Sequence, residues 1–149
     1  MRLPADWRAF IESFNSNQVD YLIVGAVALA YHSTPRYTGD LDLLVRRSPE
    51  NALRIEAALR GFGFDALGLK ASDFVDSSAV IQLGLPPNRI DLLTDIDGVP
   101  FDEAWKGRIE AELDGMRAPF IGRRELVKNK RSAGRLQDQA DLDALGPDT

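Results

Sequence analysis

The spacing of apolar residues predicts helices that alternate with short strands. In segment 6–17, large apolar side chains recur at steps of three and four residues, the spacing of one helix stripe: Trp7, Phe10, Ile11 and Phe14. A continuous apolar run over 21–24 then ends at Gly25, and the small residues that follow are typical of a tightly packed helix. The pattern predicts a docking helix, a strand, a glycine turn and a second helix.

The rest of the chain continues this alternation. A buried strand is expected at 40–45 and an amphipathic helix at 49–60, and we expect the strands 21–24 and 40–45 to be parallel, with a helix between them. Segment 62–78 has no stable period and is expected to be mostly loop. Two antiparallel hairpins follow, one formed by 79–85 and 89–94 and the other by 109–113 and 116–121. The chain then continues with two polar helices, at 126–135 and 136–145.

Length and composition set limits on the class of protein. A chain of 149 residues with 44% hydrophobic and 28% charged residues is expected to form one globular domain over 1–149, with a core at about 20–121 and carboxy-terminal helices at about 122–146. The longest apolar run, 21–31, is too short to span a membrane. The amino terminus does not have the pattern of a signal peptide, so we expect a cytoplasmic protein. Without cysteine, any metal site has to use carboxylate, imidazole or carbonyl ligands.

Charge is distributed unevenly along the chain. The net charge of −5 argues against a protein whose whole surface binds nucleic acid. Acidic residues dominate segment 91–114, whereas segment 117–135 is strongly basic. The basic segment predicts a local face that attracts anions, which leaves a polyphosphate partner open.

Three carboxylates are the candidate chemistry. Asp40 and Asp42 are two residues apart on a predicted strand, so both side chains point to one face, where they can hold a hard divalent cation. Taken alone, this pair is more often structural. Asp91 lies in an otherwise apolar strand, where a lone buried charge needs a metal or a cation. An ion pair with Arg89, two residues earlier on the same face, is the simpler alternative.

A turn of small residues precedes these carboxylates. Gly25 and Ala26 join a strand to a helix, and the free backbone N–H groups of a helix N-terminus bind phosphate oxygens. Half or more of such turns use glycine for packing or backbone conformation alone. The combination of turn and carboxylates is therefore more informative than either part.

In this combination the sequence resembles the nucleotidyltransferase fold of the DNA polymerase beta superfamily, over about residues 21–145. The resemblance is to minimal nucleotidyltransferases and abortive-infection nucleotidyltransferase toxins, whose Arg-x-Thr-x-Asp-x-Asp signature is matched by Arg36-Tyr37-Thr38-Gly39-Asp40-Leu41-Asp42. Segment 130–141 echoes their carboxy-terminal Lys, Arg and Asp pattern. The resemblance implies an α/β (α+β) fold: a mixed β-sheet flanked by helices, with a carboxy-terminal helical segment.

The resemblance also implies an activity and its site. Asp40, Asp42 and Asp91 would hold Mg²⁺ (or Mn²⁺) and be catalytic, in transfer of a nucleoside monophosphate from a nucleoside triphosphate. The nucleotide-binding residues implied are Gly25, Ala26, Arg36, Thr38, Lys130 and Arg135. From the residues alone, Lys130 is as readily a solvated helix charge, and Asp138 and Asp141 are expected to pair with Arg135. His32 is expected to pack or to cap a carbonyl.

The acceptor and partners implied are broader classes. The acceptor would be a hydroxyl of a tRNA or a protein, and a cognate toxin or antitoxin partner in a toxin-antitoxin or phage-defence system is implied as well. The turn has alanine at its second position, where the family usually has glycine or serine. This departure motivates the alternative of a catalytically weak or inactive module that binds a nucleotide or an antitoxin-like partner.

Overall fold

The computed structural model describes residues 2–33, 39–61, 69–75, 78–84 and 88–146. The helices are α1 (Ala5–Ser16), α2 (Gly25–His32), α3 (Pro49–Gly61), the 3-10 helix η2 (Ala71–Phe74), α4 (Phe101–Lys106), α5 (Arg123–Ala133) and α6 (Leu136–Leu145). The strands are β1 (Tyr21–Val24), β2 (Asp40–Val45), β3 (Val80–Leu83), β4 (Arg89–Leu93), β5 (Ile109–Leu113) and β6 (Met116–Phe120). None of the helices in the described ranges combines the length and apolar character needed to cross a bilayer.

The strands form one six-stranded mixed sheet in the order β3-β4-β2-β1-β6-β5. Both predicted hairpins are confirmed, since β3 pairs antiparallel with β4 and β5 pairs antiparallel with β6. β2 and β4 are parallel neighbours, and so are β1 and β6. The predicted mixed sheet with flanking helices and a carboxy-terminal helical segment is therefore confirmed.

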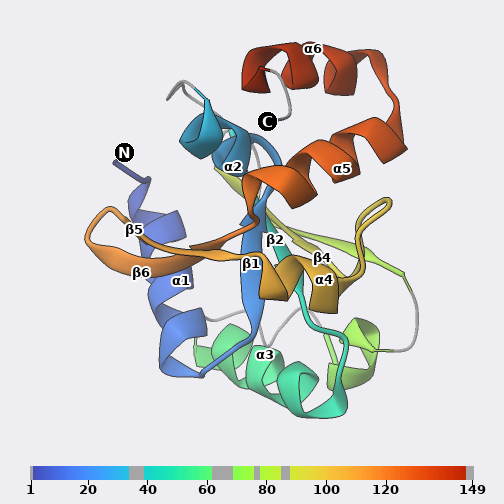
Figure 1. The fold of residues 1–149 in the computed structure, drawn as a ribbon. Coiled ribbons are helices and arrows are strands. Elements are labelled where there is room, and N and C mark those ends of the chain that lie inside the picture. Colours follow the sequence, from blue (N-terminus) through green and yellow to red (C-terminus); the bar gives the residue numbers. More distant parts are fainter. Residues whose placement is uncertain (1, 34–38, 62–68, 76–77, 85–87, 147–149) are drawn as a thin grey trace.

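The expectation that strands 21–24 and 40–45 are parallel is wrong. β1 and β2 are antiparallel, and Val24 at the end of β1 pairs with Asp42 near the start of β2. A parallel neighbour requires the connection to return along the full length of the strand. Helix α2 instead lies beyond the end of β1, beside α5 and α6, so β2 begins where β1 ends (Figure 1).

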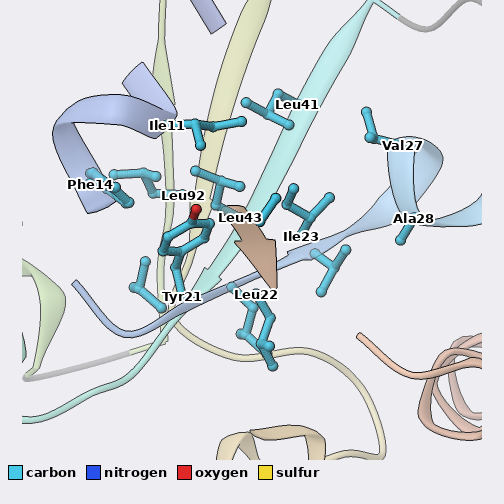
Figure 2. Close-up of a cluster of buried hydrophobic side chains, with 14 of the residues drawn as sticks. Ile11, Phe14, Tyr21, Leu22, Ile23, Val27, Ala28, Leu41, Leu43 and Leu92 are labelled. Carbon is cyan, nitrogen blue, oxygen red and sulfur yellow. The ribbon is translucent and has the colours of Figure 1, made fainter. Parts of the chain in front are cut away.

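One face of the sheet is covered by α1 and α3. The apolar stripe of α1 supplies Ile11 and Phe14, which gather over Tyr21, Leu43 and Leu92 from three strands (Figure 2). All five side chains are at most 1% exposed. Because side chains alternate along a strand, the residues next to Leu43 and Leu92 point to the opposite face. The packed face thereby determines where the carboxylates of β2 and β4 lie.

Among the remaining helices, one differs from the sequence-based expectation. α4 was not predicted, and it docks on the body through buried Ala104 and through Phe101, whose ring stacks 4.5 Å from the Arg46 guanidinium. The carboxy-terminal helices are two separate helices, and Gly134 between them has a φ of +66°, in the left-handed region that ends α5. α6 then folds back along α5 on the side of the molecule that also holds α2 (Figure 1).

Candidate active site

Strands β2 and β4 place four charged side chains next to one another. In their parallel register, Asp40 lies opposite Arg89, and Asp42 lies opposite Asp91. Residues two apart on a strand share a face, so all four side chains are on the face opposite α1 and α3. The predicted juxtaposition of Asp42 and Asp91 therefore follows from the strand register alone.

Arg89 joins two of the three carboxylates. Its Nη2 donates to Asp91 Oδ2 at 3.2 Å and to Asp40 Oδ2 at 3.4 Å. Its Nε lies 3.0 Å from Asp91 Oδ1, but the two atoms are not aligned for a hydrogen bond, and in the described part of the chain neither has another partner. The simpler alternative from the sequence, an Arg89–Asp91 pair, is thus present, and it extends to Asp40.

The surroundings of Asp42 disfavour its negative charge. Burial, followed by the negative charges of Asp91 and Asp40, raises the pKa of Asp42 to about 7. A hydrogen bond with Asp91 raises this pKa further, and the attraction of Arg89 opposes the shift without cancelling it. Near neutral pH, Asp42 and Asp91 therefore form a carboxylate pair whose charge is incompletely compensated.

The glycine turn packs directly against Asp42. Gly25 has a φ of +66°, and a Cβ built on it would overlap Oδ2 of Asp42 and lie 2.9 Å from its Cγ. Only glycine satisfies both conditions without displacing the carboxylate. The predicted strand, glycine turn and helix are confirmed, and the turn places Gly25, the first residue of α2, next to Asp42.

A cleft of about 530 Å³ opens at this point. It is lined by Gly25, Ala26 and Asp42 and, from the carboxy-terminal segment, by Lys130 and Arg135. Asp40 and Asp91 are not among its lining residues. The structure thus brings five of the predicted site residues to one cleft. Asp91 and Asp40 lie next to Asp42, on the neighbouring strand and on the same strand, but outside the cleft lining. Arg36 and Thr38 lie outside the described residues.

Lys130 is buried, so its interpretation as a solvated helix charge is wrong. Its Nζ lies 2.9 Å from Asp141 Oδ2 and 3.3 Å from Asp138 Oδ1, and only 11% of its side chain is exposed. Both carboxylates come from α6, which the turn at Gly134 folds back along α5. Lys130 is therefore a fixed cation between two helices at the wall of the cleft.

Arg135 is the N-cap residue of α6, directly before its first residue. Its backbone N–H and its Nε both donate to Asp138 Oδ2, at 3.1 and 2.7 Å, which confirms the expected pairing for Asp138. Asp141, which was expected to pair with Arg135 as well, forms its ion pair with Lys130. The hydrogen bond from the Arg135 side chain is the main cause that lowers the pKa of Asp138 to about 2. The Arg135 side chain is 74% exposed, so it is a cation at the rim of the cleft.

Most of the basic segment 117–135 is compensated within the chain, which weakens the predicted anion-attracting face. Arg117 pairs with Glu110, and Lys128 pairs with Glu103. Arg123 donates to the carbonyl of Leu145. The two basic residues at the cleft, Lys130 and Arg135, are paired as well, with Asp138 and Asp141.

Other residues at the cleft were not singled out in the sequence. Asp95 and Asp97 follow β4 and line the cleft, and Asn129 donates to the Asp97 carbonyl at 2.9 Å. The acidic character of segment 91–114, which begins at Asp91, was the feature of the sequence that could have indicated them. His32 meets its expectation, because its Nε2 lies 2.8 Å from the Ile121 carbonyl oxygen.

The donor set can be tested against a divalent cation. Among the described residues, no three or more Asp, Glu or His side chains form one ready group of ligands. Mg²⁺, however, is commonly held by one or two carboxylates together with substrate phosphates and water. Asp42 and Asp91 supply such a pair, and the raised Asp42 pKa reflects a negative charge that a cation would compensate. Asp42 and Asp91 therefore fit the group, with Asp40 beside them held by Arg89.

Comparison with known proteins supports the fold. No protein-family model matches the chain, and no curated protein matches it. Among solved structures, a Thermotoga maritima protein described as a "putative nucleotidyltransferase" is similar, with a TM-score of 0.59 and 18% sequence identity. The similarity covers 92% of this chain and 88% of that chain. At this identity the likeness establishes shared architecture, so the chain has a nucleotidyltransferase-like fold.

Proposed function

We propose that the protein is a metal-dependent nucleotidyltransferase. The reaction transfers a nucleoside monophosphate from a nucleoside triphosphate to a hydroxyl: the hydroxyl oxygen bonds to the α-phosphorus, its proton is released, and pyrophosphate leaves. The observation that carries the proposal is the position of Asp42, which lies beside Asp91 and directly under the Gly25 turn at a cleft. Carboxylates for a cation and N–H groups for phosphates thus adjoin each other.

Each part of the cleft has a role in this proposal. Asp42 and Asp91 would hold Mg²⁺ or Mn²⁺, with Asp40 as the third catalytic carboxylate. The bound cation offsets charge on the phosphate oxygens and on the attacking oxygen. The N–H groups of Gly25 and Ala26 at the start of α2 would donate to the triphosphate. Alanine keeps the backbone donor, so this role does not require the family's usual glycine or serine.

The basic residues complete the proposed nucleotide site. Lys130 and Arg135 line the same cleft as the turn, and their charges favour the triphosphate. Asp138 and Asp141 limit that contribution, because they pair with these cations. Arg36 and Thr38 are proposed as further phosphate contacts on the resemblance alone.

Of the two acceptor classes, a protein hydroxyl is the one favoured. Asp95 and Asp97 line the same cleft as Asp42, while the two basic side chains described there already face carboxylates. A tRNA end would bring further phosphate charge into these surroundings, whereas a serine, threonine or tyrosine side chain would not.

The test is transfer of label from α-³²P nucleoside triphosphates, with Mg²⁺, to purified tRNA and to protein acceptors, including the chain itself. We expect transfer by the wild type and none by Asp42→Asn. Asp102→Asn is the matched control, because Asp102 is an exposed carboxylate that pairs with Arg46 away from the cleft. Undiminished transfer by Asp42→Asn would reject the assigned site.

A second candidate function is a module that binds a nucleotide or a cognate toxin or antitoxin without turnover. The ion pairs of Arg89 with Asp40 and Asp91 favour it, since they occupy carboxylates that catalysis needs. This candidate predicts a stable complex with the product of a neighbouring gene and no labelled product. Measured turnover by a protein that elutes alone in size-exclusion chromatography after co-expression contradicts it.

A further inference from the structure

We propose that Arg89 is an internal counter-cation which holds Asp40 and Asp91 in the metal-free protein and releases at least one of them when a divalent cation binds. The inference rests on the proposed function and deepens it, because it assigns the role of a displaceable counter-ion to a residue outside the catalytic set. It predicts that the affinity of the site for metal is set by competition with Arg89.

The geometry of the Arg89 contacts supports exchange rather than a permanent link. Ion-paired N–H groups and carboxylate oxygens are typically 2.7–2.9 Å apart. The Nη2 contacts of Arg89 are longer, 3.2 Å to Asp91 and 3.4 Å to Asp40. One nitrogen is shared between two carboxylates that strand register places on adjacent strands. The guanidinium therefore faces Asp91 with two nitrogens, Nε at 3.0 Å and Nη2 at 3.2 Å, but only the Nη2 contact is a hydrogen bond, and that nitrogen is shared with Asp40.

Two buried atoms remain unsatisfied by this arrangement. Asp91 Oδ1 and Arg89 Nε have no hydrogen-bond partner in the described residues, although they lie 3.0 Å apart. Asp91 is 93% buried, since only 7% of its surface is exposed. A buried carboxylate oxygen without a hydrogen bond is a ready ligand atom for a cation. The carboxylate oxygen best able to accept a cation is thus on Asp91, the residue that Arg89 holds.

Arg89 also has room to move away. Its side chain is 27% exposed, while that of Asp91 is 10% exposed. Asp40 is the outer partner, with a side chain 43% exposed, so the contact between Arg89 and Asp40 is the one open to solvent. A cation that binds Asp91 can therefore displace the guanidinium toward Asp40 and solvent without disturbing the packed face of the sheet.

The direction in which metal affinity changes when Arg89 is removed distinguishes competition with the metal from orientation of Asp91. If Arg89 only orients Asp91, its removal weakens metal binding. If Arg89 competes with the metal, its removal leaves three carboxylates facing the cation alone and strengthens binding. Loss of one positive charge beside the site corresponds to a gain of about tenfold or more in affinity.

The experiment is a titration with Mn²⁺ alone, followed by the electron paramagnetic resonance signal of the free ion. We expect Arg89→Met to bind Mn²⁺ about tenfold more tightly than the wild type. Arg89→Lys keeps the positive charge but lacks the guanidinium that reaches two carboxylates, so its affinity for Mn²⁺ should lie between those of the wild type and Arg89→Met. Arg47→Met is the matched control, because Arg47 is exposed and donates to the Val75 carbonyl, and it should bind as the wild type does.

A measurement on the wild type keeps the inference testable if Arg89→Met does not fold. The Arg89 Nε–Hε signal, assigned by its absence in Arg89→Lys, should shift in ¹⁵N spectra when Mg²⁺ is added. Unchanged or weaker Mn²⁺ binding by Arg89→Met, or an unmoved Arg89 signal at saturating Mg²⁺, overturns the exchange and leaves the proposed metal site standing. Absence of Mn²⁺ binding in every protein, with no nucleotide transfer, overturns both.

Discussion

Gly25 and Asp42 are packed so closely that the backbone of the turn leaves no room for a side chain. A Cβ on Gly25 would overlap the Asp42 carboxylate, and the φ of Gly25, +66°, is itself unfavourable for other residues. The turn and the carboxylate are therefore a single unit, and a change in one moves the other.

Gly25→Ala should reveal this contact. The variant combines an unfavourable φ with a clash, so we expect a loss of about 2–4 kcal/mol in the free energy of unfolding. Gly115→Ala is the matched control, because Gly115 has a φ of +80° and a Cβ added there would meet no atom within 4 Å. It should lose only the backbone part, about 1 kcal/mol. Urea denaturation measures the free energy of unfolding of both variants. Equal losses would show that the Asp42 side chain moves aside at no cost.

Asp42→Asn should change how stability depends on pH. The folded pKa of Asp42, about 7, is above its ordinary value of 3.8, so the folded protein binds the proton more tightly than the unfolded chain. Wild-type stability from this group is full below pH 3.8 and is lost as pH rises through 7. Asparagine does not ionise, so the variant should gain about 1–3 kcal/mol relative to wild type by pH 8.

The pH comparison is made by urea denaturation in metal-free buffer between pH 4 and pH 8. The difference between Asp42→Asn and the wild type should grow over this range and level off above pH 7. A difference that is constant with pH would mean that Asp42 is already ionised in the folded protein at pH 4.

Lys130→Met should destabilise the docking of α6 on α5. The change leaves the carboxylates of Asp138 and Asp141 buried without their shared cation, with only 0% and 6% of these side chains exposed, which should cost about 3 kcal/mol or more. Lys128→Met, on the same helix, removes an exposed pair with Glu103 and should cost less than about 1 kcal/mol. Denaturation midpoints compare the two, and losses of similar size would contradict the buried role of Lys130.

The sequence was most informative where short-range patterns determine structure. The apolar stripe of α1, the two hairpins and the glycine turn all follow from spacing and turn residues close together in the chain. The shared site of Asp42 and Asp91 was implied by the family resemblance, and the parallel register of β2 and β4 places the two residues side by side.

Long-range relationships could not be predicted in the same way. The antiparallel pairing of β1 with β2 depends on where α2 lies, which no local pattern determines. Helix α4 has only six residues, too few to show a helical period. The burial of Lys130 depends on carboxylates that reach it only after α6 turns back on α5. Arg89 was recognised as a partner of Asp91, but its second contact, with Asp40, requires the register of two strands.

Titration calorimetry with nucleoside triphosphates, in Mg²⁺ and in EDTA, shows whether Asp42 and Asp91 form a metal-dependent nucleotide site. We expect binding that requires Mg²⁺, that falls about tenfold or more in Asp42→Asn and in Asp91→Asn, and that is unchanged in Asp102→Asn. Equal affinity in Asp42→Asn and wild type, or binding indifferent to EDTA, would contradict a metal site formed by these two carboxylates.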